Sequence, residues 1–211
     1  MVMREAHLSI LSACLVLAAW THGAMAEEVK TNLRPFLLGN YWGYRDMTTG
    51  EFVIQPQFDN ALYFSEGLAL VLVDGKWGYI NTTGEFVIKP NPQFDNAWSF
   101  SEGLAQVRVD DKLGYIDTTG KFVIRPRFYF AEDFSEGLAA VYVGGRWVEL
   151  GEGYRTAVGG KWGYVDRGGE LVISNPQFSG VESFHQGSAR VRIGDEWRSI
   201  DKTGKYVEKE E

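Results

Sequence analysis

The sequence predicts an all-β fold made of tandem antiparallel repeats, and three observations carry this prediction. The 211 residues include 25 glycines together with 7 tryptophans, 10 tyrosines and 13 phenylalanines. Glycine supplies tight turns, whereas large aromatic side chains supply buried apolar area. Short segments alternate apolar and polar residues with the period of two that is typical of β-strands. A set of short motifs also recurs about every 35 residues, which indicates a repeat architecture.

Two landmarks define the repeat. The first is Trp42-Gly43-Tyr44, and the second, further along the chain, is Phe64-Ser65-Glu66-Gly67. The first recurs as Trp77-Gly78-Tyr79, Leu113-Gly114-Tyr115 and Trp162-Gly163-Tyr164, and the second as Phe100-Ser101-Glu102-Gly103, Phe134-Ser135-Glu136-Gly137 and Phe184-His185-Gln186-Gly187. Trp197 begins a degraded copy. The chain therefore contains four full repeats and a partial fifth.

Each repeat is predicted to form three antiparallel strands. Around Trp77 the residues alternate with the period of a strand, and Asn81-Thr82-Thr83-Gly84 forms a tight turn. Phe86-Val87-Ile88 then forms the antiparallel strand that follows the turn. The third strand has one uniformly apolar face, Ala105-Val107-Val109 in one copy, which is predicted to be core. Its other face varies, with Gln106 and Arg108 in that copy, and is predicted to meet solvent or a partner.

Stacking of the repeats is required by their size. A repeat of about 35 residues cannot bury its apolar face alone, so neighbours must stack. The stack is predicted to be either a β-solenoid or a closed propeller-like ring. In a ring, the segment 33–38 would complete the sheet begun by 197–207; alternatively, the unit simply starts at the third strand.

These residues resemble the WG repeat of bacterial WG-repeat-containing proteins over about residues 41–207. The departures are Leu113 in place of Trp, Gln186 in place of Glu, and an insertion at 144–160. The resemblance implies a binding or structural module and no general catalytic role. The repeat positions taken as structural are Trp42, Gly43, Trp77, Gly78, Trp162, Gly163, Glu66, Glu102 and Glu136.

The N-terminal residues 1–26 are predicted to be a secretory signal peptide. Arg4 precedes an apolar run from Leu8 to Trp20, which is too short for a comfortable membrane span. Ala24-Met25-Ala26 then predicts cleavage after Ala26. The alternatives are a buried N-terminal helix and lipoprotein processing at Cys14. The mature protein is expected to be secreted or periplasmic, without an integral membrane span.

The remaining chain is predicted to comprise a short lead at 27–31, the repeat domain at 32–208 and a charged tail at 209–211. The formal net charge of −7 disfavours nucleic acid as a partner. Removal of Cys14 would leave no cysteine, and His185 would be the one histidine of the mature chain. No metal, cofactor or catalytic residue is predicted, since neither a phosphate-binding loop nor a catalytic triad motif is present.

The repeated glutamates Glu66, Glu102 and Glu136 allow two interpretations. Paired carboxylates serve glycoside hydrolysis, so one alternative is a cell-envelope glycan hydrolase. A catalytic pair needs two unlike environments, whereas repeats supply like ones. Gln186 also keeps the acceptor and loses the acid. We therefore expect these side chains to accept structural hydrogen bonds.

The insertion at 144–160 is the segment that does not repeat. One short strand is predicted on each side of Gly151-Glu152-Gly153, and together they form a projecting hairpin. Exposed aromatic and charged residues on an irregular segment favour binding. The candidate partner-binding residues are Arg146, Trp147, Glu149, Glu152, Tyr154 and Arg155. The function expected is that of a non-enzymatic binding or structural module for a protein or glycan partner.

Overall fold

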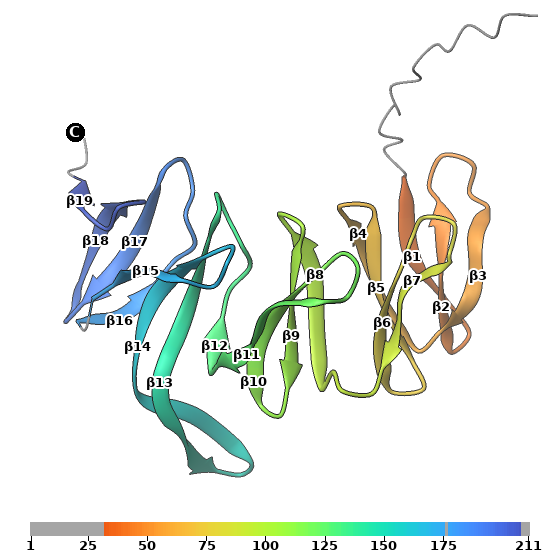
Figure 1. Ribbon diagram of the computed structural model, residues 1–211. Coiled ribbons are helices and arrows are strands. Elements are labelled where there is room, and N and C mark those ends of the chain that lie inside the picture. Colours follow the sequence, from red (N-terminus) through yellow and green to blue (C-terminus); the bar gives the residue numbers. More distant parts are fainter. Residues whose placement is uncertain (1–31, 176, 208–211) are drawn as a thin grey trace, which may run out of the picture. The chain divides into compact units, whose positions relative to one another are not determined.

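The computed structural model describes residues 32–175 and 177–207, and this part of the chain forms five antiparallel β-sheets that follow one another in chain order (Figure 1). The all-β prediction is therefore confirmed. The first sheet contains β1 (Leu33–Leu38), β2 (Tyr41–Asp46) and β3 (Phe52–Phe58). The second contains β4 (Asn60–Ser65), β5 (Leu68–Val73), β6 (Lys76–Ile80) and β7 (Phe86–Asn91). The third contains β8 (Asn96–Ser101), β9 (Leu104–Val109), β10 (Lys112–Asp117) and β11 (Phe122–Phe128). The fourth contains β12 (Phe130–Ala131), β13 (Leu138–Gly151), β14 (Tyr154–Asp166) and β15 (Leu171–Ser174). The fifth contains β16 (Phe178–Val181), β17 (Ser188–Ile193), β18 (Glu196–Asp201) and β19 (Tyr206–Val207).

The prediction of three strands per repeat is wrong for four of the five sheets, which have four strands each. The strand that the sequence pattern did not reveal is the outer one, β4 in the second sheet. Ala61 pairs with Val71 and Phe64 pairs with Ala69, so two residues of β4 lie opposite a single residue of β5. This β-bulge breaks the period of two by which strands are recognised in a sequence.

The predicted frame of the repeat also needs correction. The strand that follows each Ser-Glu-Gly turn pairs with the next Trp-Gly-Tyr strand, so the sheet starts at the outer strand. β1 accordingly pairs with β2 in its own sheet, and the fifth sheet holds four strands. Within the described residues the incomplete unit is the first one, and each sheet is built from strands that are consecutive in the chain.

The Trp-Gly-Tyr glycines are required by close approach of the neighbouring strand. A Cβ placed on Gly78 would lie 2.8 Å from the backbone nitrogen of Pro90 and 2.9 Å from the carbonyl oxygen of Ile88. Contacts this short do not occur for real side chains, so no other residue fits without moving β7. The register shift between β6 and β7 at this point is the bulge that brings the two backbones together.

Four hydrophobic clusters lie between consecutive sheets. Between the second and third sheets, Leu68 and Leu70 of β5 pack with Phe100, Ala105 and Val107 of β8 and β9. Ala69 and Val71, on the other face of β5, belong to the cluster shared with the first sheet. The inner strand β5 is therefore covered on both faces. The expectation that the varied face meets solvent is wrong at Gln106, which is only 5% exposed, because the fourth sheet covers it.

The tyrosines of the Trp-Gly-Tyr motif join each sheet to the next. Tyr44, Tyr79, Tyr115 and Tyr164 are each 0% exposed. Their hydroxyl groups donate hydrogen bonds of 2.7 Å to the carbonyl oxygens of Leu62, Trp98, Glu132 and Glu182 in the following sheet. Burial raises the pKa of all four hydroxyls above the ordinary range of tyrosine. Within the described residues the fifth sheet has no following sheet, and Ser199 stands where the other copies have tyrosine.

Candidate functional site

The repeated glutamates form a ladder between the Ser-Glu-Gly turns of neighbouring sheets. The backbone N–H groups of Glu102 and Gly103 donate to the two carboxylate oxygens of Glu66 at 2.6 and 2.7 Å. Glu136 and Gly137 donate to Glu102 in the same way, at 2.5 and 2.8 Å. The turn residues adopt positive φ angles, 52° at Glu102 and 74° at Gly103, which point both N–H groups at one anion.

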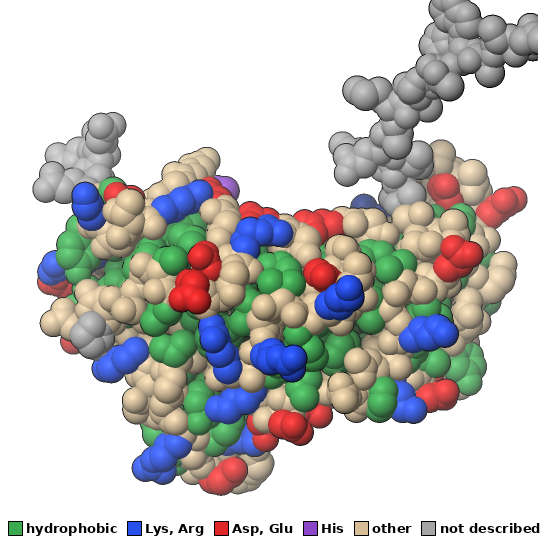
Figure 2. Space-filling model, viewed as in Figure 1, with side chains coloured by type: hydrophobic (Ala, Val, Ile, Leu, Met, Phe, Trp, Pro, Cys, Tyr) green, Lys and Arg blue, Asp and Glu red, His purple; other side chains and the backbone are tan. Residues whose placement is uncertain are grey.

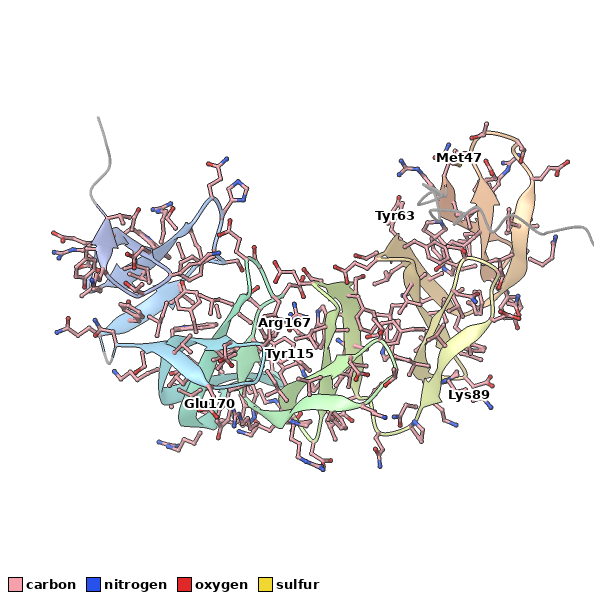
Figure 3. The ribbon with its side chains drawn as sticks, turned by 45° about the horizontal axis from the view of Figure 1, so that its top comes forward. Met47, Tyr63, Lys89, Tyr115, Arg167 and Glu170 are labelled. Carbon is pink, nitrogen blue, oxygen red and sulfur yellow. The ribbon has the colours of Figure 1, made fainter. Side chains whose placement is uncertain are left out.

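The ladder continues to the fifth sheet, where Gly187 donates to both carboxylate oxygens of Glu136. Lys202 lies 3.1 Å from the same carboxylate and, together with these backbone bonds, lowers its pKa. Arg167, in the turn between β14 and β15 (Figure 3), pairs more loosely with Glu102 at 3.8 Å. The repeated glutamates are thus held in like structural roles and lie in separate repeats.

The repeat tryptophans Trp42, Trp77 and Trp162 pack against three of the four clusters and are half-buried. The fully buried side chain of the motif is the tyrosine. Part of each indole ring therefore remains accessible beside an interface between two sheets. At Trp162 that accessible surface belongs to a cavity.

Residues 144–160 form the distal part of a long hairpin, β13–β14, which extends beyond the neighbouring strands (Figure 1). Glu149 pairs with Arg155, and Gly151 pairs with Tyr154 around the turn. Arg146, Glu149 and Glu152 are exposed, and Tyr154 is 71% exposed. These four side chains point to solvent.

The other two candidate residues on the hairpin contact the body of the protein. Trp147 packs edge-on against Tyr129 and Phe130 at 5.2 and 5.6 Å between ring centroids. The Arg155 guanidinium lies over the Trp147 ring and pairs with Asp111, whose pKa it lowers. The hairpin residues that the sequence grouped together thus divide into a solvent-facing set and a set that anchors the hairpin.

A cavity of about 460 Å³ lies between the third and fourth sheets. Its lining comprises Trp98, Gln106, Arg108, Leu113, Phe130, Ala131, Glu132, Asp133 and Trp162. We call this cavity the interlayer pocket. Its volume falls within the range of pockets that bind small molecules.

The interlayer pocket exists because the repeat changes at positions that face it. In the second sheet the three register-equivalent positions hold Leu70, Leu72 and Trp77. In the third sheet they hold Gln106, Arg108 and Leu113. Two long polar side chains and a smaller apolar one thus replace a continuous apolar surface. The replacement of Trp by Leu113 removes an indole ring at the place where the pocket opens.

The outer strands contribute the rest of the change. Trp98 stands where the second sheet has Leu62, and Phe130 stands where it has Asn60. The Phe130 ring stacks on Trp162 at 6.2 Å with an interplanar angle of 22°. Because Phe130 also contacts Trp147, the hairpin supports one wall of the pocket.

Polar groups of both kinds converge in the interlayer pocket. The buried amide of Gln106 donates to the Asp133 carboxylate at 2.7 Å, which fixes both side chains. Partial burial and the neighbouring Asp133 charge raise the pKa of Glu132. The Arg108 guanidinium lies 5.6 Å from the centre of the Trp98 ring. Hydrogen-bond donors and acceptors therefore lie beside aromatic surface in one small volume.

The sequence patterns did not identify the interlayer pocket as a site, although three signals were visible in them. Leu113 is a departure from the repeat, and Gln106 and Arg108 lie on the varying face of the third strand. Their convergence depends on the outer strand β8, which was not in the predicted layout, and on the way the fourth sheet packs against the third. On the face seen in Figure 2 basic and acidic side chains are interspersed. No group of three His, Cys, Asp or Glu in the described ranges is arranged to hold a metal ion. The described part of the chain also has no helix able to cross a membrane.

Comparison with solved structures gives resemblances in fold at low identity. A eukaryotic initiation factor matches with a TM-score of 0.52 and 13% identity, over 85% of this chain and 53% of that one. Hsv2 of Kluyveromyces lactis matches with a TM-score of 0.45 and 11% identity, over 84% and 60% of the two chains. The extracellular domain of a putative hybrid two component system from B. thetaiotaomicron matches with a TM-score of 0.41 and 13% identity, over 81% and 27%. The chain thus spans about half the length of the first of these structures.

No curated protein is similar enough to the chain to count as a match. A protein family described as WG containing repeat does match, over residues 42–77, 77–112, 114–147 and 162–197. These segments take in the four Trp-Gly-Tyr strands and, in three of them, the Ser-Glu-Gly turn that forms the glutamate ladder. The chain belongs to the WG containing repeat family.

Proposed function

We propose that the protein is a non-enzymatic binding module that takes a glycan in the interlayer pocket. The observation that carries this proposal is the convergence of departures from the repeat. Gln106, Arg108 and Leu113 of the third sheet stand where the second sheet has Leu70, Leu72 and Trp77, and all three line the pocket. Together with Trp98, Phe130 and Trp162 they place polar groups beside aromatic rings in one small volume.

A sugar ring suits the chemistry of the pocket. Its C–H faces are apolar and pack on aromatic rings such as Trp98 and Trp162. Its hydroxyl groups both donate and accept, which matches a pocket that holds carboxylates, a guanidinium and a carboxamide. The volume of about 460 Å³ accommodates roughly one or two sugar rings.

The compartment proposed is the bacterial periplasm or the cell exterior. This part rests on the sequence of residues 1–26, which lies outside the described residues. The solvent-facing hairpin residues Arg146, Glu149, Glu152 and Tyr154 provide a second surface, suited to a protein partner.

The stack of sheets is proposed to be an open solenoid, because closure into a ring would bury the outward faces of the first and fifth sheets. Those faces are exposed, with Phe36 on β1 at 39% and Trp197 on β18 at 41%. Small-angle scattering of the purified protein tests this. An open stack has a radius of gyration clearly above the value of about 16 Å expected for a compact domain of this size, whereas a closed ring has a value near it.

The binding proposal is tested by titrating saccharides from the bacterial envelope into the wild-type protein and three variants. Trp98→Ala and Asp133→Asn are expected to weaken binding about tenfold or more, since each removes a wall or a fixed acceptor. Trp197→Ala is the matched control, because it removes an indole from a different sheet. Equal loss in all three variants, or none in any, contradicts the proposal.

The second candidate function is glycan hydrolysis, and one observation favours it. Partial burial and the neighbouring Asp133 raise the pKa of Glu132, and a carboxyl group in such an environment suits the role of a general acid. Release of reducing sugar from the bound saccharide distinguishes the two functions. Turnover that Glu132→Gln abolishes, with binding retained, establishes the hydrolase and excludes the non-enzymatic module.

A further inference from the structure

Within the described residues, the first sheet lacks the outer strand that the other four sheets have. In each of the second to fifth sheets, the outer strand pairs with the strand that follows it in the chain, as β4 pairs with β5. The equivalent edge of β1 has no paired strand within residues 32–175 and 177–207. A free edge carries a row of unpaired N–H and C=O groups, which is a template for an added strand.

Apolar side chains accompany this edge. Phe36 of β1 occupies the register position of Val71 in β5, opposite the Trp-Gly-Tyr glycine. Val71 is 0% exposed, whereas Phe36 is 39% exposed and Leu38 is 57% exposed. On β1, larger apolar residues than those of β5 therefore lie on a face that no other described sheet covers.

The turn of Glu66 and Gly67 on the second sheet resembles the carboxylate-binding turns of the third and fourth sheets, but no described residue supplies its carboxylate. In the third and fourth sheets, the two turn N–H groups hold the carboxylate of the preceding repeat. The corresponding N–H groups of Glu66 and Gly67 have no acceptor in the described part of the chain, although the turn has the same positive φ angles of 52° and 79°. A Cβ built on Gly67 would have no atom within 4 Å, so the approach is open.

The Phe64 carbonyl, next to this turn, also has no serine hydroxyl bonded to it among the described residues. Ser65 donates to the carbonyl oxygen of Phe100 at 2.7 Å, and Ser101 donates to that of Phe134 at 2.8 Å. The carbonyl oxygen of Phe64 receives no such bond from any described residue. In the other sheets, one outer strand and its turn supply three partners: the paired strand, the carboxylate and the serine hydroxyl. Within the described residues, none of the three is supplied to the edge of β1, the turn of Glu66 or the Phe64 carbonyl.

We propose that the free edge of β1 binds an extended, acidic peptide segment of a partner protein as an additional antiparallel strand. Three of the four internal copies, those of the second to fourth sheets, specify its chemistry. A small residue lies opposite Phe36, as Ala61 lies opposite Val71. The segment ends in an apolar residue, a serine that donates to the Phe64 carbonyl, and a glutamate whose carboxylate accepts from the Glu66 and Gly67 N–H groups. Recognition by strand addition draws its affinity from backbone hydrogen bonds and its specificity from such side-chain contacts.

The charge at this edge agrees with an acidic segment. The Arg34 guanidinium of β1 lies 5.6 Å from the ring centre of Tyr63 on β4. Tyr63 is 59% exposed and lies near the first sheet (Figure 3). The strand with the free edge thus carries a cation, and the turn that would bind the carboxylate offers two backbone donors with no acceptor among the described residues.

The test uses a fluorescein-labelled peptide with the sequence of residues 96–102, Asn-Ala-Trp-Ser-Phe-Ser-Glu, titrated with the purified full chain. We expect saturable binding by fluorescence anisotropy. A peptide ending in glutamine is expected to bind about tenfold more weakly, because it loses the charge-assisted bonds. Phe36→Lys is expected to abolish binding, whereas Leu150→Lys, the same change at an exposed apolar residue on the hairpin, leaves it intact.

Slowed amide hydrogen exchange in residues 33–38 on peptide addition gives a second readout that does not depend on a variant. Absence of saturable binding up to about 1 mM overturns the proposal, as does equal affinity for the glutamate and glutamine peptides. Occupation of the edge by residues 27–31 of the chain itself produces the first of these results. Envelope saccharides do not compete for this site, so the outcome is independent of the interlayer pocket.

Discussion

The tyrosine of each Trp-Gly-Tyr motif joins its sheet to the following one. The Tyr79 hydroxyl is buried, and it donates to the carbonyl oxygen of Trp98 in the next sheet. Tyr79→Phe leaves that carbonyl without this donor, so we expect a loss of about 1–3 kcal/mol in the free energy of unfolding, measured by urea denaturation. Tyr154→Phe, at a residue that is 71% exposed, is expected to change it by less than about 0.5 kcal/mol. Equal effects of the two changes would show that the buried hydroxyl does not join the sheets.

The glutamate ladder gives a prediction that separates structure from catalysis. Glu102→Gln keeps one acceptor oxygen but places an amide against the Gly137 or Glu136 N–H group. We expect a loss of about 1 kcal/mol in stability, reduced by solvent since the side chain is 33% exposed. Saccharide binding at the interlayer pocket is expected to remain unchanged.

The control for this prediction is Glu152→Gln on the exposed turn of the hairpin, which should leave thermal stability unchanged. A Glu102→Gln variant as stable as the wild type would contradict the ladder. A variant of normal stability that had lost a hydrolytic activity would return the repeated glutamates to a catalytic role.

At the scale of the element, the distal part of the hairpin β13–β14 is expected to be removable. Gly144 pairs with Gly160, and Gly145 and Gly159 have positive φ angles of 85° and 76°, so joining Gly145 to Gly159 leaves residues suited to a tight turn. Deletion of 146–158 should preserve the far-ultraviolet circular dichroism of the sheets. Saccharide affinity should fall, because Phe130 loses the support of Trp147.

Two results would contradict this account of the hairpin. An unfolded deletion variant would show that the hairpin is part of the folding unit. Unchanged affinity for the saccharide would show that Trp147 does not support the pocket wall.

The sequence was sufficient to predict the strands that alternate regularly, the turns and the stacking of repeats. Asn81 illustrates the turns, since its side-chain oxygen accepts from the Thr83 and Glu85 N–H groups at 3.0 Å. The outer strands escaped prediction because a bulge interrupts their period. The interlayer pocket escaped because its walls come from β8, β9, β10, β12 and β14, and contacts between sheets leave no local pattern. Only the breaks in the repeat at residues such as Leu113 pointed to it.

For the whole molecule, stability is expected to fall at both ends of the pH scale. Hydrogen bonds from Thr48, Thr119 and Thr203 lower the pKa values of Asp46, Asp117 and Asp201 in the folded state. A lowered carboxyl pKa stabilises the fold above the unfolded value near 4, and this stabilisation is lost as pH falls below it. Glu132 has a raised pKa and opposes the trend weakly.

At alkaline pH all four buried tyrosines lower the stability of the folded state. Their pKa values are raised by burial, so above about pH 10 the unfolded chain ionises while the folded chain does not, and stability falls. Denaturant midpoints measured from pH 3 to pH 11 should therefore show a plateau that falls at both ends. A midpoint that stayed constant above pH 10 would mean that these hydroxyls are not buried in solution.

The central claim is that this stack of repeats binds a glycan where the third and fourth sheets meet. It is tested most directly by following the indole N–H resonances of the tryptophans by NMR during titration with envelope saccharides. We predict that the Trp98 and Trp162 resonances shift in a saturable manner, while Trp197 of the fifth sheet does not move. Shifts confined to Trp197, or no shift in any tryptophan across the saccharides, would contradict the claim.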